Sequence, residues 1–287
     1  MTDAQEQRKV KARIGMVNFI NTAPIYEIWK RKVHRPEWSI VAAPPRTLNQ
    51  MLFLDELDMG VVSSVEYATH PTRYRILSDL SISASGPVGS VFLFSKTAPE
   101  NLGGLTVLLS DQSQTSVSLV KIILEEFYHA YPRYISGAVF EPGKERKTAA
   151  AVLAIGDDAL RLAKQDEYKV RLDLGEVWQQ HTGLPFVFAV WTVRKDFCEK
   201  QPDCVREIHR ELLRCLTEGK RNLAAISRKV APRIPMKPEL CLNYLQSMEY
   251  DLGSEKLKAL ESFYEILIKR GEGNAHALPL QFFPAST

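Results

Sequence analysis

Short apolar runs alternate with stretches of helical period along the first hundred residues. Four of the runs have the length and β-branched content of buried strands, at 13–17, 39–42, 59–62 and 91–94. Between the strands, apolar positions recur with the period of a helix at 24–30 and from 47 to about 54. This alternation predicts an α/β fold, with a parallel sheet and helical crossovers.

The pattern restarts at residue 105 and becomes helical after residue 202. Apolar runs at 105–109, 151–155 and 186–191 predict further strands, and an amphipathic helix follows the polar residues 113–116. We predict one lobe formed by 1–94 with 191–287 and an inserted lobe formed by 95–190. Strands near Val91 and Val190 would cross between the lobes, so that the loops after the strands face a central ligand cleft.

Several residues have the chemistry of helix and strand ends. Thr22 is a candidate N-cap for the first helix, and Thr47 and Ser63 each begin a capping box. Ser254 is the predicted N-cap of the last helix. The small residues at 81–87 predict a loop.

Composition and charge exclude several classes of protein. The 287 residues contain 37 Lys and Arg against 34 Asp and Glu, a net charge of +3 that is scattered along the chain. We therefore predict no nucleic-acid partner. No apolar run approaches the roughly 20 residues that span a bilayer, so no membrane partner is predicted. The polar first 13 residues lack the apolar core of a signal peptide, which favours a cytoplasmic location.

The cysteines do not form a recognisable ligand set. Cys198, Cys204, Cys215 and Cys241 contain no C-x-x-C pair, and no cluster of histidines lies near them at ligand spacing. We therefore predict no metal site and reduced thiols.

Four loops at the predicted cleft share one chemistry, that of neutral hydrogen-bonding groups. Their polar residues are Asn18, Asn21 and Thr22; Ser63 and Ser64; Ser83, Ser85 and Ser90; and Ser113, Thr115 and Ser116. Three of the loops begin a predicted helix, where free N–H groups and the helix dipole favour an anion. The loops therefore predict a cleft that binds a small anionic ligand.

Each of these residues also has a purely structural interpretation. Helix capping alone explains Ser63 and Thr47, whereas the polar residues at 113–116 exceed what one cap needs. Asp157 is either a base or the cap of the next helix. His181 is interpreted as a solvated loop residue.

An ordered set of motifs resembles those of one family, the chorismate dehydratases of menaquinone biosynthesis. The motifs lie within 14–24, 58–67, 81–91, 113–116, 155–160, 173–178 and 182–189. The resemblance covers roughly residues 13–195, and the helical C-terminal part carries no motif.

The resemblance implies a two-lobed fold of the type II periplasmic-binding-protein class, used in the cytoplasm as an enzyme. It implies a hydro-lyase that removes water from chorismate to give 3-[(1-carboxyvinyl)oxy]benzoate, the first step of the futalosine route, without metal or organic cofactor. It assigns catalysis to Asn21 and Ser90. The candidate substrate-binding residues are Asn18, Thr22, Ser63, Ser64, Gly89, Ser113, Thr115, Ser116, Asp157, Leu184 and Pro185. Phe19 departs from the family, where Tyr is more usual.

The implied chemistry accounts for amides and hydroxyls in place of acids. Two substrate carboxylates would repel a carboxylate base, so we hypothesise that the enolpyruvyl carboxylate of the substrate itself takes the C3 proton. Two alternatives are a non-catalytic cytoplasmic binding protein or sensor for a small carboxylate, and the related cyclase of the same pathway. The cyclase is expected to carry a serine- and cysteine-rich loop where this chain has F-I-N-T. The sequence does not predict an oligomeric state.

Overall fold

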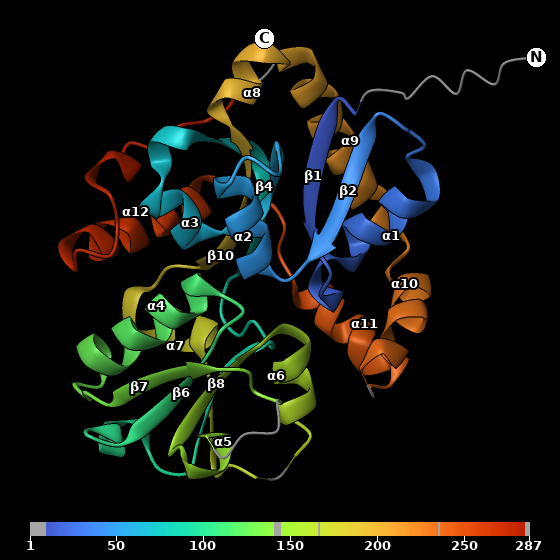
Figure 1. Cartoon of the computed structure of the whole chain (residues 1–287). Helices are drawn as coiled ribbons and strands as arrows, with labels where there is room; N and C mark the ends of the chain where they lie inside the picture. The colour runs from blue at the N-terminus through green and yellow to red at the C-terminus, as the bar shows by residue number, and fades with distance from the viewer. Residues whose placement is uncertain (1–9, 141–144, 166, 235, 285–287) are drawn as a thin grey trace, which may run out of the picture.

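The computed structural model describes residues 10–140, 145–165, 167–234 and 236–284 and contains two five-stranded sheets. Each sheet forms the centre of one lobe, and the two lobes lie one above the other in Figure 1. The first nine residues, on which the predicted location largely depends, lie outside the described ranges.

The first sheet has the order β2-β1-β3-β10-β4. Its strands are β1 (Ala12–Val17), β2 (Trp38–Ala43), β3 (Met59–Ser63), β4 (Tyr74–Ala84) and β10 (Phe186–Arg194). β1 is parallel to both of its neighbours, with Ile14 opposite Ile40 and Met59. β10 is antiparallel to β3 and β4. The predicted parallel sheet is therefore correct only for the three strands at one side.

The second sheet repeats this arrangement in the order β7-β6-β8-β5-β9. Its strands are β5 (Val91–Ser95), β6 (Thr106–Ser110), β7 (Arg133–Gly137), β8 (Ala151–Ile155) and β9 (Val170–Asp173). β6 is parallel to β7 and β8, and β5 is antiparallel to β8 and β9. β5 and β8 are fully buried, as continuous apolar runs require.

Helices cover both sheets, and the C-terminal part of the chain is helical as predicted (Figure 1). The first lobe contains α1 (Ala23–Lys32), α2 (Pro45–Phe53) and α3 (Ser64–Thr69), and the second contains α4 (Gln114–Ile122), α5 (Glu145–Thr148), α6 (Gly156–Leu162) and α7 (Leu174–Thr182). The C-terminal helices are α8 (Lys195–Lys200), α9 (Pro202–Arg221), α10 (Leu223–Val230), α11 (Pro238–Ser247) and α12 (Ser254–Lys269). The apolar positions of α9 at Val205, Ile208 and Leu212 are buried. This helix packs on α1.

The chain passes between the sheets twice. It leaves the first sheet at Ala84 and enters the second at Val91, and it returns between α7 and Phe186. Each of β5 and β10 belongs to one sheet, so the passages precede these strands. We therefore propose lobe boundaries a few residues before the 94/95 and 190/191 positions predicted from the sequence.

Four local predictions are wrong. His181 lies in α7 instead of a loop. Thr47 does not cap a helix, because α2 already begins at Pro45 and Thr47 lies inside it. Residues 81–84 form the end of β4 instead of a loop, since Ser81 and Ser83 are buried and bonded to the segment near Glu249. Gly253 occupies the N-cap position of α12, and Ser254 is its first residue.

The described part of the chain contains neither a membrane-spanning helix nor a cluster of metal ligands. None of its helices is long and apolar enough to cross a membrane. Within the same residues, no group of three or more His, Cys, Asp or Glu side chains could hold a metal ion. All four cysteines are free thiols.

Candidate active site

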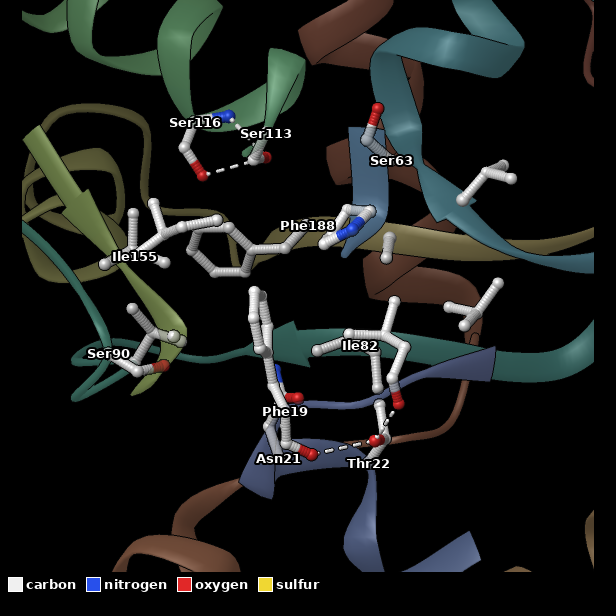
Figure 2. Close-up of a pocket in the computed structure, with 18 residues that line it drawn as sticks. Phe19, Asn21, Thr22, Ser63, Ile82, Ser90, Ser113, Ser116, Ile155 and Phe188 are labelled. Atoms are coloured by element: carbon white, nitrogen blue, oxygen red, sulfur yellow. Dashed lines mark hydrogen bonds between the residues drawn. The ribbon is translucent and has the colours of Figure 1, made fainter. Parts of the chain in front are cut away.

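A cavity lies between the two lobes. Figure 2 shows residues of both lobes pointing into it. Its polar lining consists of Asn21, Thr22, Ser63, Ser90, Ser113 and Ser116. Its other lining residues are Val17, Phe19, Pro45, Val61, Val62, Ile82, Val88, Val91, Ile155, Gly156, Phe188 and Ala189. Six predicted site residues are thus brought together from four segments that are far apart in the sequence.

The other predicted site residues do not line this cavity, and their roles in binding stay predictions. Three of them contribute backbone groups to nearby structure. The Asn18 carbonyl accepts a hydrogen bond from Arg233, and the Gly89 N–H donates to Asp173 over 2.7 Å. The Pro185 carbonyl accepts from the indole N–H of Trp178 over 3.1 Å.

A fourth residue, Leu184, also contributes a backbone group, whereas the last three contribute side chains. Leu184 donates its N–H to the Thr182 hydroxyl over 3.1 Å. Ser64 donates its hydroxyl to the Val187 carbonyl. Thr115 accepts from the Val65 N–H over 3.0 Å, and Asp157 accepts from the Ile20 N–H over 3.1 Å.

The hydrogen bonds of Thr115 and Asp157 join the two lobes directly. Thr115 and Asp157 belong to the second lobe, and their donors belong to the first. The Asn49 amide adds a third link by donating to the Gln114 side chain over 3.1 Å. The lobes are therefore closed on each other around the cavity.

Helix capping accounts for only one of the polar loops. Ser113 caps α4 by accepting from the Ser116 N–H over 3.3 Å, and it also accepts from the Ser116 hydroxyl over 3.2 Å (Figure 2). Thr22 and Ser63 occupy N-cap positions, but neither side chain accepts a capping bond. Asp157 is not the cap of α6, whose N-cap is Ile155. The structural interpretation is therefore wrong for Ser63 and for Asp157.

A buried amide holds the Ser63 hydroxyl. Asn49 is 2% exposed, and its Nδ2 donates to Ser63 Oγ over 2.9 Å while its Oδ1 accepts from the Ser63 N–H over 3.1 Å. Because this donor already occupies one lone pair of Ser63 Oγ, the serine proton is free to donate into the cavity. Asn49 escaped sequence analysis because it lay in the incorrectly assigned capping box at 47–50.

Asn21 offers an acceptor that no described residue of the protein donates to. It lies in the 3₁₀ turn Ile20–Thr22 that leads into α1, and its backbone carbonyl accepts from the Tyr250 hydroxyl over 2.7 Å. Its Oδ1 is buried and has no hydrogen-bond partner among the described residues. Buried acceptors are nearly always satisfied in folded proteins, so this oxygen is suited to a donor on a bound molecule.

Ser90 is held at the first turn into β5. The Asp173 carboxylate accepts the N–H groups of Val88 and Gly89 over 3.0 and 2.7 Å, and the Ser90 carbonyl accepts from the Gly156 N–H over 2.7 Å. Burial raises the pKa of Asp173, although the N–H groups that it accepts lower it. The Ser90 hydroxyl accepts from Tyr244 over 2.8 Å.

None of the described residues that line the cavity is ionisable. The nearest carboxyl along the chain is Asp157, beside Gly156, and burial raises its pKa against the lowering effect of the Ile20 N–H. The N-cap residues of α1 and α4, Thr22 and Ser113, do line the cavity, and the N-terminus of a helix favours an anion through its backbone N–H groups. This arrangement can bind an anion without a cationic side chain.

Aromatic and aliphatic groups form the rest of the wall. Phe19 and Phe188 both project into the cavity, with Ile82 and Ile155 close by (Figure 2). Phe188 lies in the apolar run 186–191, which was predicted to form a strand, and its side chain is 8% exposed. Flat apolar walls with polar groups at the edges suit a ring that carries polar substituents.

Comparison with known proteins agrees with this site. The family model described as menaquinone biosynthesis matches residues 12–269. The chain belongs to this family. The sequence is 32% identical over 271 residues to the chorismate dehydratase of Thermus thermophilus, covering 88% of this chain and 94% of the relative. The resemblance to chorismate dehydratases is thereby confirmed.

Solved structures confirm the fold class. The protein AF1704 from Archaeoglobus fulgidus has a TM-score of 0.69 at 20% identity, covering 93% of this chain and 99% of its own. The alkanesulfonate-binding protein SsuA from Xanthomonas axonopodis pv. citri, bound to MOPS, has a TM-score of 0.68 at 12% identity, with 92% and 94% covered. The family member thus has the two-lobed periplasmic-binding-protein-like fold.

Proposed function

We propose that this protein is a chorismate dehydratase, which converts chorismate to 3-[(1-carboxyvinyl)oxy]benzoate for menaquinone biosynthesis. The observation that carries the proposal is a partly apolar cavity between the lobes whose described lining groups are all neutral, in a chain 32% identical to a chorismate dehydratase. Chorismate has a six-membered ring and two carboxylates. The cavity offers flat walls for the ring, and hydroxyls, amides and helix N-termini for the carboxylates.

The lining also bears on the proton acceptor. Elimination removes a proton from C3 and the hydroxyl from C4, and it leaves an aromatic ring. Since no lining side chain is a base, we assign the C3 proton to the enolpyruvyl carboxylate of the substrate. The role of the protein is then orientation, which can lower a barrier by up to about 7–11 kcal/mol in favourable systems.

We assign Asn21 and Ser90 to the reacting end of the substrate. The unpartnered Asn21 Oδ1 can accept from the C4 hydroxyl, and the Ser90 proton can donate to the leaving oxygen or to a carboxylate. Ser63 and Ser113, whose hydroxyls only accept hydrogen bonds from described residues, would donate to the remaining substrate oxygens. Thr22 and Ser116 would line the substrate site, with their protons already donated to the carbonyls of Val17 and Phe19 and to Ser113. Hydrogen bonds to charged groups contribute about 1.5–3 kcal/mol each, so a few suffice for binding.

We further propose that the reaction needs no metal or organic cofactor, takes place in the cytoplasm and belongs to the futalosine route. The lining contains none of the His, Cys, Asp or Glu side chains that usually ligate a catalytic metal. A chelator should therefore leave turnover unchanged.

The direct test is to incubate the purified protein with chorismate and EDTA and to identify the product by mass spectrometry and NMR. Formation of 3-[(1-carboxyvinyl)oxy]benzoate supports the proposal. Binding of chorismate that is returned intact would instead indicate a sensor on the same fold. If Asn21→Ala and Ser90→Ala both retain near-full turnover at saturating chorismate, the assignment of these two residues is wrong.

A further inference from the structure

A tyrosine from the C-terminal helices contacts the Ser90 hydroxyl. Tyr244 lies in α11, 154 residues along the chain from Ser90, and its hydroxyl donates to Ser90 Oγ over 2.8 Å. Ser90 is 1% exposed and Tyr244 8% exposed, so bulk water does not compete for this bond. Tyr244 does not line the cavity.

Hydrogen bonds fix the backbone around Ser90, so only the Ser90 side chain is free to change its orientation. Gly89 has a positive φ of 71°, and the N–H groups of Val88 and Gly89 are fixed by Asp173. The Ser90 carbonyl is fixed by Gly156. The hydroxyl, in contrast, has Tyr244 as its only hydrogen-bond partner among residues the structure describes.

The direction of this hydrogen bond decides what Ser90 can do. A serine hydroxyl has one proton and two lone pairs, and a tyrosine hydroxyl that donates to it occupies one lone pair. Burial raises the pKa of Tyr244, and the nearby carboxyls of Asp157 and Asp173 act in the same direction, so the tyrosine keeps its proton. The Ser90 proton is then directed away from Tyr244, toward the cavity.

We propose that Tyr244 is a positioning residue, which holds the Ser90 hydroxyl as a hydrogen-bond donor to the substrate. This inference rests on the proposed function. Without the tyrosine hydroxyl, Ser90 can turn its proton to other acceptors, and the population that is ready to donate falls. We expect the effect to be confined to the reacting geometry, because Tyr244 does not line the cavity.

The test is a double-mutant cycle on chorismate turnover with Tyr244→Phe, Ser90→Ala and the double variant. Tyr244→Phe keeps the ring and removes one hydrogen bond, so we expect kcat to fall about 3- to 10-fold with KM changed less than about twofold. In the Ser90→Ala background, the same substitution should change kcat by less than about twofold, since the residues act as one unit.

Tyr74→Phe is the matched control. Tyr74 is also a buried tyrosine with a hydroxyl bond to a side chain, donating to Glu66 over 2.9 Å, and it does not line the cavity. It should lower the melting temperature by a similar amount but leave kcat unchanged. Equal losses of kcat in both variants would assign the effect of Tyr244 to stability and overturn the inference.

The remaining outcomes separate the inference from the proposed function. Multiplicative losses in the double variant, or an unchanged kcat in Tyr244→Phe, would overturn the positioning role while chorismate dehydration by the wild type stands. Failure of the wild type to convert chorismate would overturn the proposed function and the inference with it.

Discussion

The ring of Phe19 lies directly on Gly156, across the boundary between the lobes. A Cβ on residue 156 would come within 2.8 Å of the ring, closer than real side chains approach. Gly156 also has a φ of +56°, a conformation that glycine adopts without strain. The closed cavity therefore depends on the absence of a side chain at this position.

Gly156→Ala should hinder lobe closure. Overpacking costs about 1–3 kcal/mol, so we expect kcat/KM for chorismate to fall about tenfold or more.

Gly104→Ala is the matched control, since Gly104 has a φ of +71° and a Cβ there would meet nothing within 4 Å. Steady-state kinetics of both variants, with melting temperatures, separate closure from backbone strain. Partial recovery by adding Phe19→Leu is expected, and equal losses in the two glycine variants would contradict this explanation.

A negative charge inside the cavity should be worse than a missing side chain. Asn21→Asp keeps the shape of the residue but places a carboxylate where no lining cation can balance it. At an effective dielectric constant of 20, like charges about 5 Å apart repel by about 3 kcal/mol. We expect chorismate to bind Asn21→Asp at least about tenfold more weakly than Asn21→Ala at pH 8, as measured by calorimetry. Equal affinities would show that the substrate carboxylates lie far from Asn21.

The Asn49 amide should control the direction of the Ser63 proton. Asn49→Asp replaces the donor to Ser63 Oγ by an acceptor, so the serine hydroxyl would turn toward the new carboxylate and away from the cavity. We expect KM for chorismate to rise about tenfold, on the scale of one hydrogen bond to a charged group. Gln114→Ala removes only the link between Asn49 and the second lobe. If this variant raises KM as much as Asn49→Asp, closure and not the Ser63 proton is responsible.

Glu66 should make stability depend on pH. It is 4% exposed and accepts from the Tyr74 hydroxyl over 2.9 Å, and burial raises its pKa from an ordinary value of 4.5 to about 7. The folded protein therefore holds a proton that the unfolded chain has lost between these two pH values. The free energy of unfolding should fall as pH rises through this window, by up to about 3 kcal/mol, and level off above it.

Glu66→Gln tests this effect because it keeps the acceptor for Tyr74 and removes the ionisation. The difference in melting temperature between the variant and the wild type should shift in favour of the variant from pH 5 to pH 8. A difference that is constant across this range would show that Glu66 ionises normally.

The sequence predicted most of the fold because period and length identify apolar strands and amphipathic helices. The predicted parallel direction is wrong for β5 and β10, which are antiparallel to their neighbours, because a buried apolar run looks the same in the sequence whichever way its strand runs. Three strands were missed. No residue of β7 and only Asp173 of β9 is buried, so neither forms an apolar run, and serines and an aspartate interrupt the apolar residues of β4. The polar lining of the cavity was predicted from loops and motifs. Its supports were not, because Tyr244 and Tyr250 lie 154 and 229 residues from the groups they contact.

The two passages between the lobes leave the first sheet at neighbouring points. Phe186 lies opposite Ala84 in the antiparallel pair of β4 and β10, so the whole second lobe occupies the place of a hairpin loop. Both ends of the second lobe are therefore attached at one place on the first sheet. A movement of the second lobe as a rigid body would be a rotation about this place. A short turn joining residues 84 and 186 would also close the first sheet without breaking a strand, so the first lobe is topologically complete when the second is excised.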